Sequence, residues 1–108
     1  MIARMWSGVT RVGSLDAYLA HLRETTFPAL QDLPGHRGAY VLQRTADDRT
    51  IVTVITLWDS IDAIARFAGA DVDAAVVPPE AQLLLASWDA RAVHWEVVFD
   101  NAGPLRAK

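Results

Sequence analysis

The sequence predicts an α+β domain whose strands and helices follow the order β-α-β-β-α-β. Residues 50–58 form an almost unbroken run of β-branched and apolar side chains, which favours a strand covered on both faces. Residues 15–30 instead repeat their apolar side chains at helical spacing. With 108 residues the chain forms one domain. The order is that of a ferredoxin-like fold, in which a four-stranded antiparallel sheet carries both helices on one face.

The first half of the chain predicts a strand, a helix and a second strand. Residues 2–9 alternate loosely and form the first strand. Ser14 is expected to cap the helix. Pro28 is expected to kink the helix or end its regular part, because proline removes one intrahelical hydrogen bond. The Pro-Gly pair at 34–35 closes this segment, and residues 36–45 form the second strand.

The second half begins with a turn at residues 46–49 and the strand over residues 50–58. Asp59 or Ser60 caps a second helix, which ends at Gly69. Its apolar side chains recur at helical spacing and predict the face that packs on the sheet: Ile61, Ile64, Ala65 and Ala68.

The C-terminal third predicts a short helix and a final strand. Pro79 suits the first position of a helix, which is expected to continue through Leu85. The last strand covers residues 91–99, so the domain spans residues 1–99 and residues 100–108 form a tail.

One face of the predicted sheet has no helix to cover it. Along residues 50–58 both sets of alternating side chains are largely apolar, and only one set can meet the helices of the same chain. The other set would form a large exposed apolar patch. Two-fold pairing is the commonest way to cover such a face. We therefore expect a homodimer in which two sheets form an α/β barrel.

Composition excludes several classes of function. The chain has no Cys, which excludes disulfides, thiol nucleophiles and Cys-ligated metals. The net charge is −3 and no Lys/Arg cluster is present, so a nucleic-acid partner is not expected. No segment has the length of a signal peptide's apolar core or of a membrane span. A cytoplasmic protein without a membrane partner is expected.

Several short motifs, in this order and at these spacings, are shared with a known family. They are Met1–Trp6, Phe27-Pro28, Pro34–Gly38, Trp58–Ser60, Phe67–Gly69, Ala75–Ala81 and His94–Val97. Over residues 1–99 the chain resembles the antibiotic biosynthesis monooxygenase family of the dimeric α/β barrel superfamily. The resemblance implies small cytoplasmic dimers with a pocket between sheet and helices in each subunit. Some members oxidise aromatic polyketide intermediates without metal or flavin, and others bind and degrade haem.

The residues of the haem-degrading branch do not carry over to this chain. That branch has an Asn in the first strand, a Trp in the second helix and a His about ten residues beyond it. The corresponding positions here lie near Trp6, Phe67 and Val77. The quinone-forming branch also relies on the helix Trp, where this chain has Phe67. The resemblance therefore disfavours haem degradation, and no cofactor or metal is expected.

His94 is the predicted catalytic residue. His94 and Glu96 share one face of the last strand. Glu96 would orient the imidazole, and His94 would act as a general base on an acidic phenol or a carbon acid. The structural alternative makes His94 a core or interface residue. In that alternative Glu96 pairs with Arg4 on the neighbouring strand, which would leave His94 free.

Aromatic side chains are the predicted walls of a ligand slot. The four Trp residues could line the slot or simply supply core area, and Trp6 and Trp58 are the preferred wall residues, with Trp95 as packing. Tyr40 and Phe67 complete the predicted walls. His21 lies three residues before Glu24, but scattered His residues without an i,i+4 pair are a weak metal signal, so His21 is expected to be solvated.

The sequence thus predicts a cofactor-independent monooxygenase-like enzyme acting on a small aromatic or polyketide-type molecule. Arg4, Trp6, Tyr40, Trp58, Phe67 and Glu96 are the predicted ligand-binding residues, and His94 is the predicted base. Two alternatives stay open. One is a dimer that binds a small ligand without chemistry, and the other is a lyase or isomerase of the same superfamily, in which His94 would move a proton without oxygen.

Overall fold

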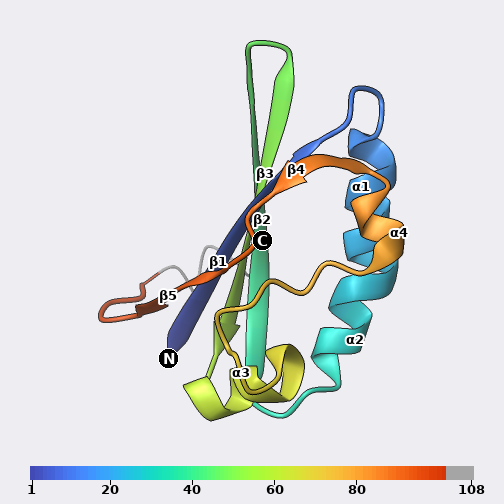
Figure 1. The fold of residues 1–108 in the computed structure, drawn as a ribbon. Helices are drawn as coiled ribbons and strands as arrows, with labels where there is room; N and C mark the ends of the chain where they lie inside the picture. Colours follow the sequence, from blue (N-terminus) through green and yellow to red (C-terminus); the bar gives the residue numbers. More distant parts are fainter. Residues whose placement is uncertain (102–108) are drawn as a thin grey trace.

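The computed structural model describes residues 1–101 and confirms the predicted α+β class. An antiparallel sheet lies on one side of the molecule and the helices lie on the other (Figure 1). The strands are β1 (Ile2–Thr10), β2 (His36–Ala46), β3 (Arg49–Trp58), β4 (Leu85–Trp88) and β5 (Val93–Glu96). The helices are α1 (Leu15–His21), the π-helical segment η1 (Leu22–Thr26), α2 (Phe27–Gln31), α3 (Ile61–Ala68) and α4 (Pro79–Gln82). Most of the predicted tail, residues 102–108, lies outside the described residues.

The sheet has five strands where four were predicted. Its order is β2-β3-β1, and β4 and β5 both pair with the second edge of β1. β4 lies opposite residues 8–10 and β5 opposite residues 2–5. β5 is shorter than the last strand predicted over residues 91–99, and β4 is an additional strand that precedes it. The helix expected to reach Leu85 ends at Gln82, because Leu85 is fully buried against the sheet and pairs with Thr10 as part of a strand.

Pro28 changes the first helix in the way that its chemistry requires. α-Helical bonding stops at His21, and over η1 the helix widens, so that the N–H of Phe27 donates to the carbonyl of Leu22 five residues earlier. A widened turn tolerates the proline ring and its missing N–H. Ser14 stands at the predicted N-terminal position, but its side chain makes no capping hydrogen bond.

The predicted turn before β3 and the predicted cap of α3 are both confirmed. β2 and β3 form a hairpin in which Ala46 pairs with Arg49, and both residues between them, Asp47 and Asp48, have positive φ. That combination defines a two-residue hairpin turn that matches the twist of the strands. Ser60 caps α3 by accepting a hydrogen bond from the N–H of Ala63 at 3.2 Å.

The buried face of α3 differs from the predicted face. Ala63 and Ile64 are buried, whereas Ile61 is exposed. Ala63 replaces Ile61 because the loop at Gly35 packs closely there: a Cβ on Gly35 would lie 2.6 Å from that of Ala63. The small side chain of Ala63 therefore lets the β2 entry loop approach α3.

The two faces of the sheet have different environments. Val52 and Trp58 of β3 are fully buried under the helices. On the opposite face, Leu42, Val93 and Trp95 are about half exposed. Trp95 is therefore only partly packed within residues 1–101, and the open face is the one for which the sequence predicts a second copy.

Candidate functional site

A partly open cavity of about 70 Å³ lies between the sheet and the first helix. Its sheet side is formed by β1 and β3, its helix side by α1, η1 and α2, and its end by the segment after α3. The lining residues are Arg4, Trp6, Tyr18, His21, Leu22, Thr26, Phe27, Leu30, Val54, Thr56, Phe67, Val76, Val77, Pro78 and Ala81. Most of these side chains are apolar or aromatic, which is typical of small-molecule sites.

Trp6 supplies the aromatic wall on the sheet side. Its indole N–H donates to the carbonyl of Asp89 at 2.7 Å, which ties β1 to the connection between β4 and β5. The ring lies across Gly8, where an added Cβ would stand only 2.9 Å from Cη2 of the indole. Glycine at position 8 therefore lets the ring lie close to the strand.

The helix side carries three polar side chains. These are Tyr18, His21 and Thr26. Tyr18 and His21 belong to α1, and Thr26 is the last residue of the widened turn η1. Tyr18 is 2% exposed, and its ring lies 6.4 Å from that of His21, between ring centroids. No hydrogen bond of these three side chains to any of residues 1–101 is present. Burial raises the pKa of the Tyr18 phenol to about 12, so it stays protonated at neutral pH.

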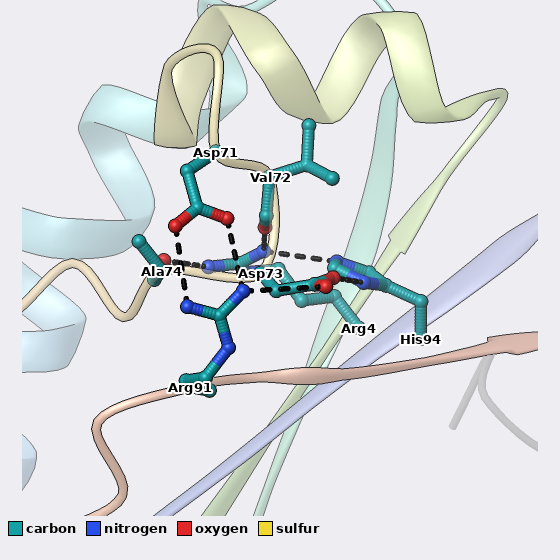
Figure 2. A network of polar contacts seen from close by, with 7 residues as sticks. All are labelled: Arg4, Asp71, Val72, Asp73, Ala74, Arg91 and His94. Atoms are coloured by element: carbon teal, nitrogen blue, oxygen red, sulfur yellow. Dashed lines mark hydrogen bonds and ion pairs between the residues drawn. The ribbon is translucent and has the colours of Figure 1, made fainter.

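Arg4 joins the cavity to a polar network at the sheet edge (Figure 2). Its guanidinium is almost fully buried and donates to the carbonyls of Val72 and Ala74, the latter at 2.7 Å. The same group lies 5.7 Å from the ring centroid of Phe67, within range of a cation–π contact. Burial lowers the pKa of Arg4, and the charge of Asp73 partly opposes this shift. Arg4 thereby pins the segment after α3 to β1.

His94 is the second member of this network. The Arg4 guanidinium lies 2.9 Å from Nε2 of His94, and Asp73 Oδ1 lies 2.9 Å from Nδ1. Arginine can only donate, so Nε2 accepts and the ring proton is on Nδ1, where it is donated to Asp73. Both ring nitrogens are therefore engaged.

Two exposed ion pairs complete the network. Arg91 contacts both carboxylate oxygens of Asp71, at 3.0 and 3.2 Å, and lies 3.5 Å from Asp73. We call the five side chains Arg4, Asp71, Asp73, Arg91 and His94 the clamp. Figure 2 shows that the clamp joins β1, the loop after α3 and the segment that leads into β5.

Three of the predicted ligand-binding residues line the cavity, namely Arg4, Trp6 and Phe67. Tyr40 does not, because it pairs with Ile55 and so lies on the opposite face of the sheet from Val54. Trp58 does not line it either. It is fully buried behind Phe67, with the ring centroids 5.9 Å apart, and its indole N–H donates to the Thr56 hydroxyl.

His94 and Glu96 lie away from the cavity lining. His94 stands opposite Arg4 in the register of β1 and β5, and Asp73 holds its ring in place of the predicted Glu96. Glu96 is exposed, and its side chain has no hydrogen bond or ion pair within residues 1–101, so the alternative Arg4–Glu96 pair is wrong. The catalytic role of His94 stays a prediction, and the structure commits its acceptor nitrogen to Arg4.

Tyr18 and His21 are the titratable cavity residues that the sequence reasoning missed. Tyr18 belonged to the predicted apolar stripe, and His21 was expected to be solvated. The available signal was their spacing: residues three apart share a helix side, and Leu22 beside them is an obvious core residue. Polar side chains beside the buried apolar residues of a helix can border an internal cavity as well as the protein surface.

Within residues 1–101, no helix has the length and apolar character needed to cross a membrane. Over the same residues, no group of three His, Asp or Glu side chains is arranged to hold a metal ion.

Comparison with known proteins identifies the family. A family model for antibiotic biosynthesis monooxygenases matches residues 3–77. The comparison with curated proteins found no match. Among solved structures, a variant of MhuD with two manganese protoporphyrin IX molecules bound per active site has a TM-score of 0.66 at 21% identity, covering 95% of this chain and 100% of that chain.

A second solved structure is assigned to the same family. This protein, from Chloroflexus aurantiacus J-10-fl, has a TM-score of 0.59 at 20% identity, covering 93% of this chain and 95% of that chain. At these identities the structural matches show a shared fold. Because the family model spans more than half of the sequence, the chain belongs to the antibiotic biosynthesis monooxygenase family.

Proposed function

We propose that the protein is a cofactor-independent monooxygenase-like enzyme acting on a small aromatic or polyketide-type molecule in the cavity beside Trp6. Membership of the family supports a general monooxygenase-like or small-ligand-binding role. The observation that carries the finer proposal is the cavity itself, whose walls are aromatic and apolar with a few polar groups on one side.

The size of the cavity indicates how a ligand enters. A cavity that binds benzene measures about 150 Å³, whereas this one measures about 70 Å³. A ring therefore enters only if a wall moves outward. The segment Val76–Pro78 lines the cavity without belonging to a helix or strand, so it is the wall with the fewest backbone constraints.

The reaction that fits these residues needs no cofactor. A CH₂ group between aromatic rings, as in an anthrone, loses two hydrogens and gains one oxygen atom from O₂ to become a carbonyl, and the other oxygen atom leaves as water. The substrate is the reductant. The chain would supply an apolar slot, stabilisation of the substrate anion and exclusion of water.

The residues at the positions of the haem-degrading branch argue against haem. Val77, near the position where the resemblance places an imidazole ligand, offers no donor atom. We therefore propose that the protein is indifferent to haem. Titration with haem should give no sharp Soret shift and no ascorbate-driven bleaching, whereas tight binding with turnover would contradict the proposal.

Oxygen consumption with an anthrone tests the proposed activity. The wild-type protein should consume one O₂ for each carbonyl formed, in a buffer that contains a metal chelator. Trp6→Ala should lose most of this activity because it removes the indole wall. Trp88→Ala is the matched control, since Trp88 is partly exposed and does not line the cavity. Binding of the anthrone without oxygen consumption would instead support the non-catalytic alternative.

We also propose that two copies pair through the open face of the sheet. Three apolar side chains on that face are about half exposed, namely Leu42, Val93 and Trp95. Burial of each would stabilise the dimer by roughly 1–2 kcal/mol. Sedimentation at micromolar concentration should show a dimer whose thermal midpoint rises with protein concentration. A stable, well-folded monomer would contradict this proposal.

A further inference from the structure

We propose that Tyr18 and His21 form a recognition site for an acidic aromatic hydroxyl, with His21 accepting its proton and Tyr18 donating a hydrogen bond to the oxyanion that results. This inference rests on the proposed function, because it assigns the substrate class and the proton acceptor within the same cavity. It replaces the solvated role that the sequence suggested for His21.

The hydroxyl of Tyr18 is the first observation. Tyr18 is 2% exposed and lines the cavity, and its hydroxyl has no hydrogen bond to residues 1–101. The hydroxyl oxygen is not fully enclosed, because within these residues the only fully buried polar side-chain atom without a partner is Nδ1 of His36. Tyrosine hydroxyls usually have a hydrogen-bond partner, and the fold supplies none here. The hydroxyl is therefore available to a ligand in the cavity.

The imidazole of His21 is the second observation. It lines the same cavity from the next turn of the helix, its ring lies 6.4 Å from the Tyr18 ring, and neither nitrogen has a protein partner in residues 1–101. A general base needs a free lone pair that faces its substrate. The nitrogens of His21 have no competing partner within residues 1–101, whereas the acceptor nitrogen of His94 is occupied by Arg4.

The charge of the cavity favours an anion. Among residues 1–101, the charged or titratable side chains that line it are Arg4, Tyr18 and His21, and no Asp or Glu is among them. Arg4 is held in place by its two carbonyl partners, so its positive charge is fixed at the wall. A preorganised positive charge and a hydroxyl donor stabilise a developing oxyanion.

The proposed step is a proton transfer. The O–H bond of the phenol or enol breaks, its electron pair stays on oxygen, and a new N–H bond forms on His21. The products are an oxyanion and an imidazolium, so charge and atoms balance and no oxidant takes part. The electron-rich anion is the form of an aromatic substrate that reacts with O₂ in the proposed activity.

A coloured phenol provides the test, because 4-nitrophenol absorbs differently as the neutral phenol and as the phenolate. Bound to the wild-type protein, it should show the phenolate band at a pH where the free probe is neutral. Tyr18→Phe should weaken binding of the phenolate about tenfold, the usual effect of removing a hydrogen bond to a charged group. His21→Gln should move the appearance of the phenolate band to higher pH.

Two controls separate this inference from the proposed function. The first is 4-nitrotoluene, which has no hydroxyl and should bind the wild-type protein and Tyr18→Phe equally. The second is Glu24→Gln, an exposed change on the same helical segment outside the cavity lining, which should leave both probes unaffected.

Each outcome has a distinct meaning. If both probes bind but the two variants treat 4-nitrophenol like the wild-type protein, the inference is wrong and the aromatic cavity stands. Equal weakening of both probes in Tyr18→Phe would show a packing role and would also overturn the inference. If neither probe binds the wild-type protein, the proposed function itself fails.

Discussion

The clamp and the helix wall of the cavity are both partly buried groups of polar side chains, yet they differ in one respect. In the clamp, every side chain has a hydrogen-bond or ion-pair partner: Arg4 donates to two carbonyls and to His94, His94 donates to Asp73, and Arg91 pairs with Asp71. On the helix wall, the side chains of Tyr18, His21 and Thr26 have no hydrogen bond within residues 1–101.

This difference separates structural residues from candidate functional ones. Folded proteins satisfy nearly all of their buried polar groups, and the exceptions call for an explanation. The clamp follows the rule and holds the loop after α3 against β1. The helix wall differs, because its polar side chains border the cavity without a partner in the fold, and none of them is fully enclosed: within residues 1–101 the only fully buried polar side-chain atom without a partner is Nδ1 of His36. Polar side chains that the fold leaves without a partner are expected at functional sites.

Replacing Arg4 should have the largest effect on stability. Arg4→Met leaves the carbonyls of Val72 and Ala74 without their donor, and each unsatisfied buried group costs about 1–3 kcal/mol. We expect the free energy of unfolding, measured by urea denaturation, to fall by about 3 kcal/mol. Arg37→Met, which removes an exposed ion pair with Asp59, should change it little. Equal effects would show that the clamp does not stabilise the fold.

Gly8→Ala should disturb the cavity through Trp6. The new methyl group would lie 2.9 Å from Cη2 of Trp6 and 3.4 Å from Cδ2 of Leu85, so the indole must move. Crowding of this kind costs about 2 kcal/mol. We expect a lower thermal midpoint, a shifted tryptophan emission and weaker binding of 4-nitrotoluene. Unchanged binding would show that the indole is not a wall of the ligand site.

His94→Ala should have a smaller effect than Arg4→Met. It removes the contacts to Asp73 and Arg4, but Arg4 keeps both carbonyl partners, so we expect a loss of about 1 kcal/mol. Activity on an anthrone should fall only slightly, because Arg4 keeps its position at the cavity wall. Complete loss of activity in a variant of wild-type stability would instead support the catalytic role that the sequence predicts for His94.

Tyr18→Phe should have the smallest effect on stability. At neutral pH its free energy of unfolding should be equal to that of the wild-type protein or slightly higher. Its effect appears at high pH. The folded protein keeps the Tyr18 proton until about pH 12, while the unfolded chain releases it near the ordinary pKa of 10.0. A raised folded-state pKa gives stability that is present below pH 10 and lost as the pH rises toward 12.

Urea denaturation at pH 8 and pH 11 measures this difference. The free energy of unfolding of the wild-type protein should fall between pH 8 and pH 11, because the unfolded chain releases the Tyr18 proton. Tyr40→Phe is the control and should show the same fall, whereas Tyr18→Phe should show a smaller one. If Tyr18→Phe is already destabilised at pH 8, the hydroxyl has a structural partner and the comparison between the two regions fails.

The fold was predictable wherever local chemistry decides it. The β-branched run of β3, the cap at Ser60, the turn at 46–49 and the proline effect at Pro28 all act over a few residues. The additional strand β4 was not predictable in this way. Leu85 and its neighbours have helix-forming side chains, and pairing with β1 determines their conformation.

The candidate site was predictable only in part. Arg4 and Trp6 are two residues apart on one strand, so they share a face of the sheet, and both line the cavity. Tyr40 was misplaced because the register of β2 against β3, with a shift between His36 and Gly38, determines which of its residues face the helices. The proposed roles of Tyr18 and His21 depend on the absence of hydrogen-bond partners for their side chains, and no local sequence pattern reveals such an absence.

A crystal structure of the protein with bound 4-nitrophenol tests the central claim most directly. The account predicts the aromatic ring against Trp6 and Phe67, with the phenol oxygen within hydrogen-bond distance of the Tyr18 hydroxyl and a ring nitrogen of His21. The clamp should be unchanged. A phenol oxygen bound by Arg4 and His94 in a rearranged clamp, with Tyr18 and His21 still without partners, would contradict the account.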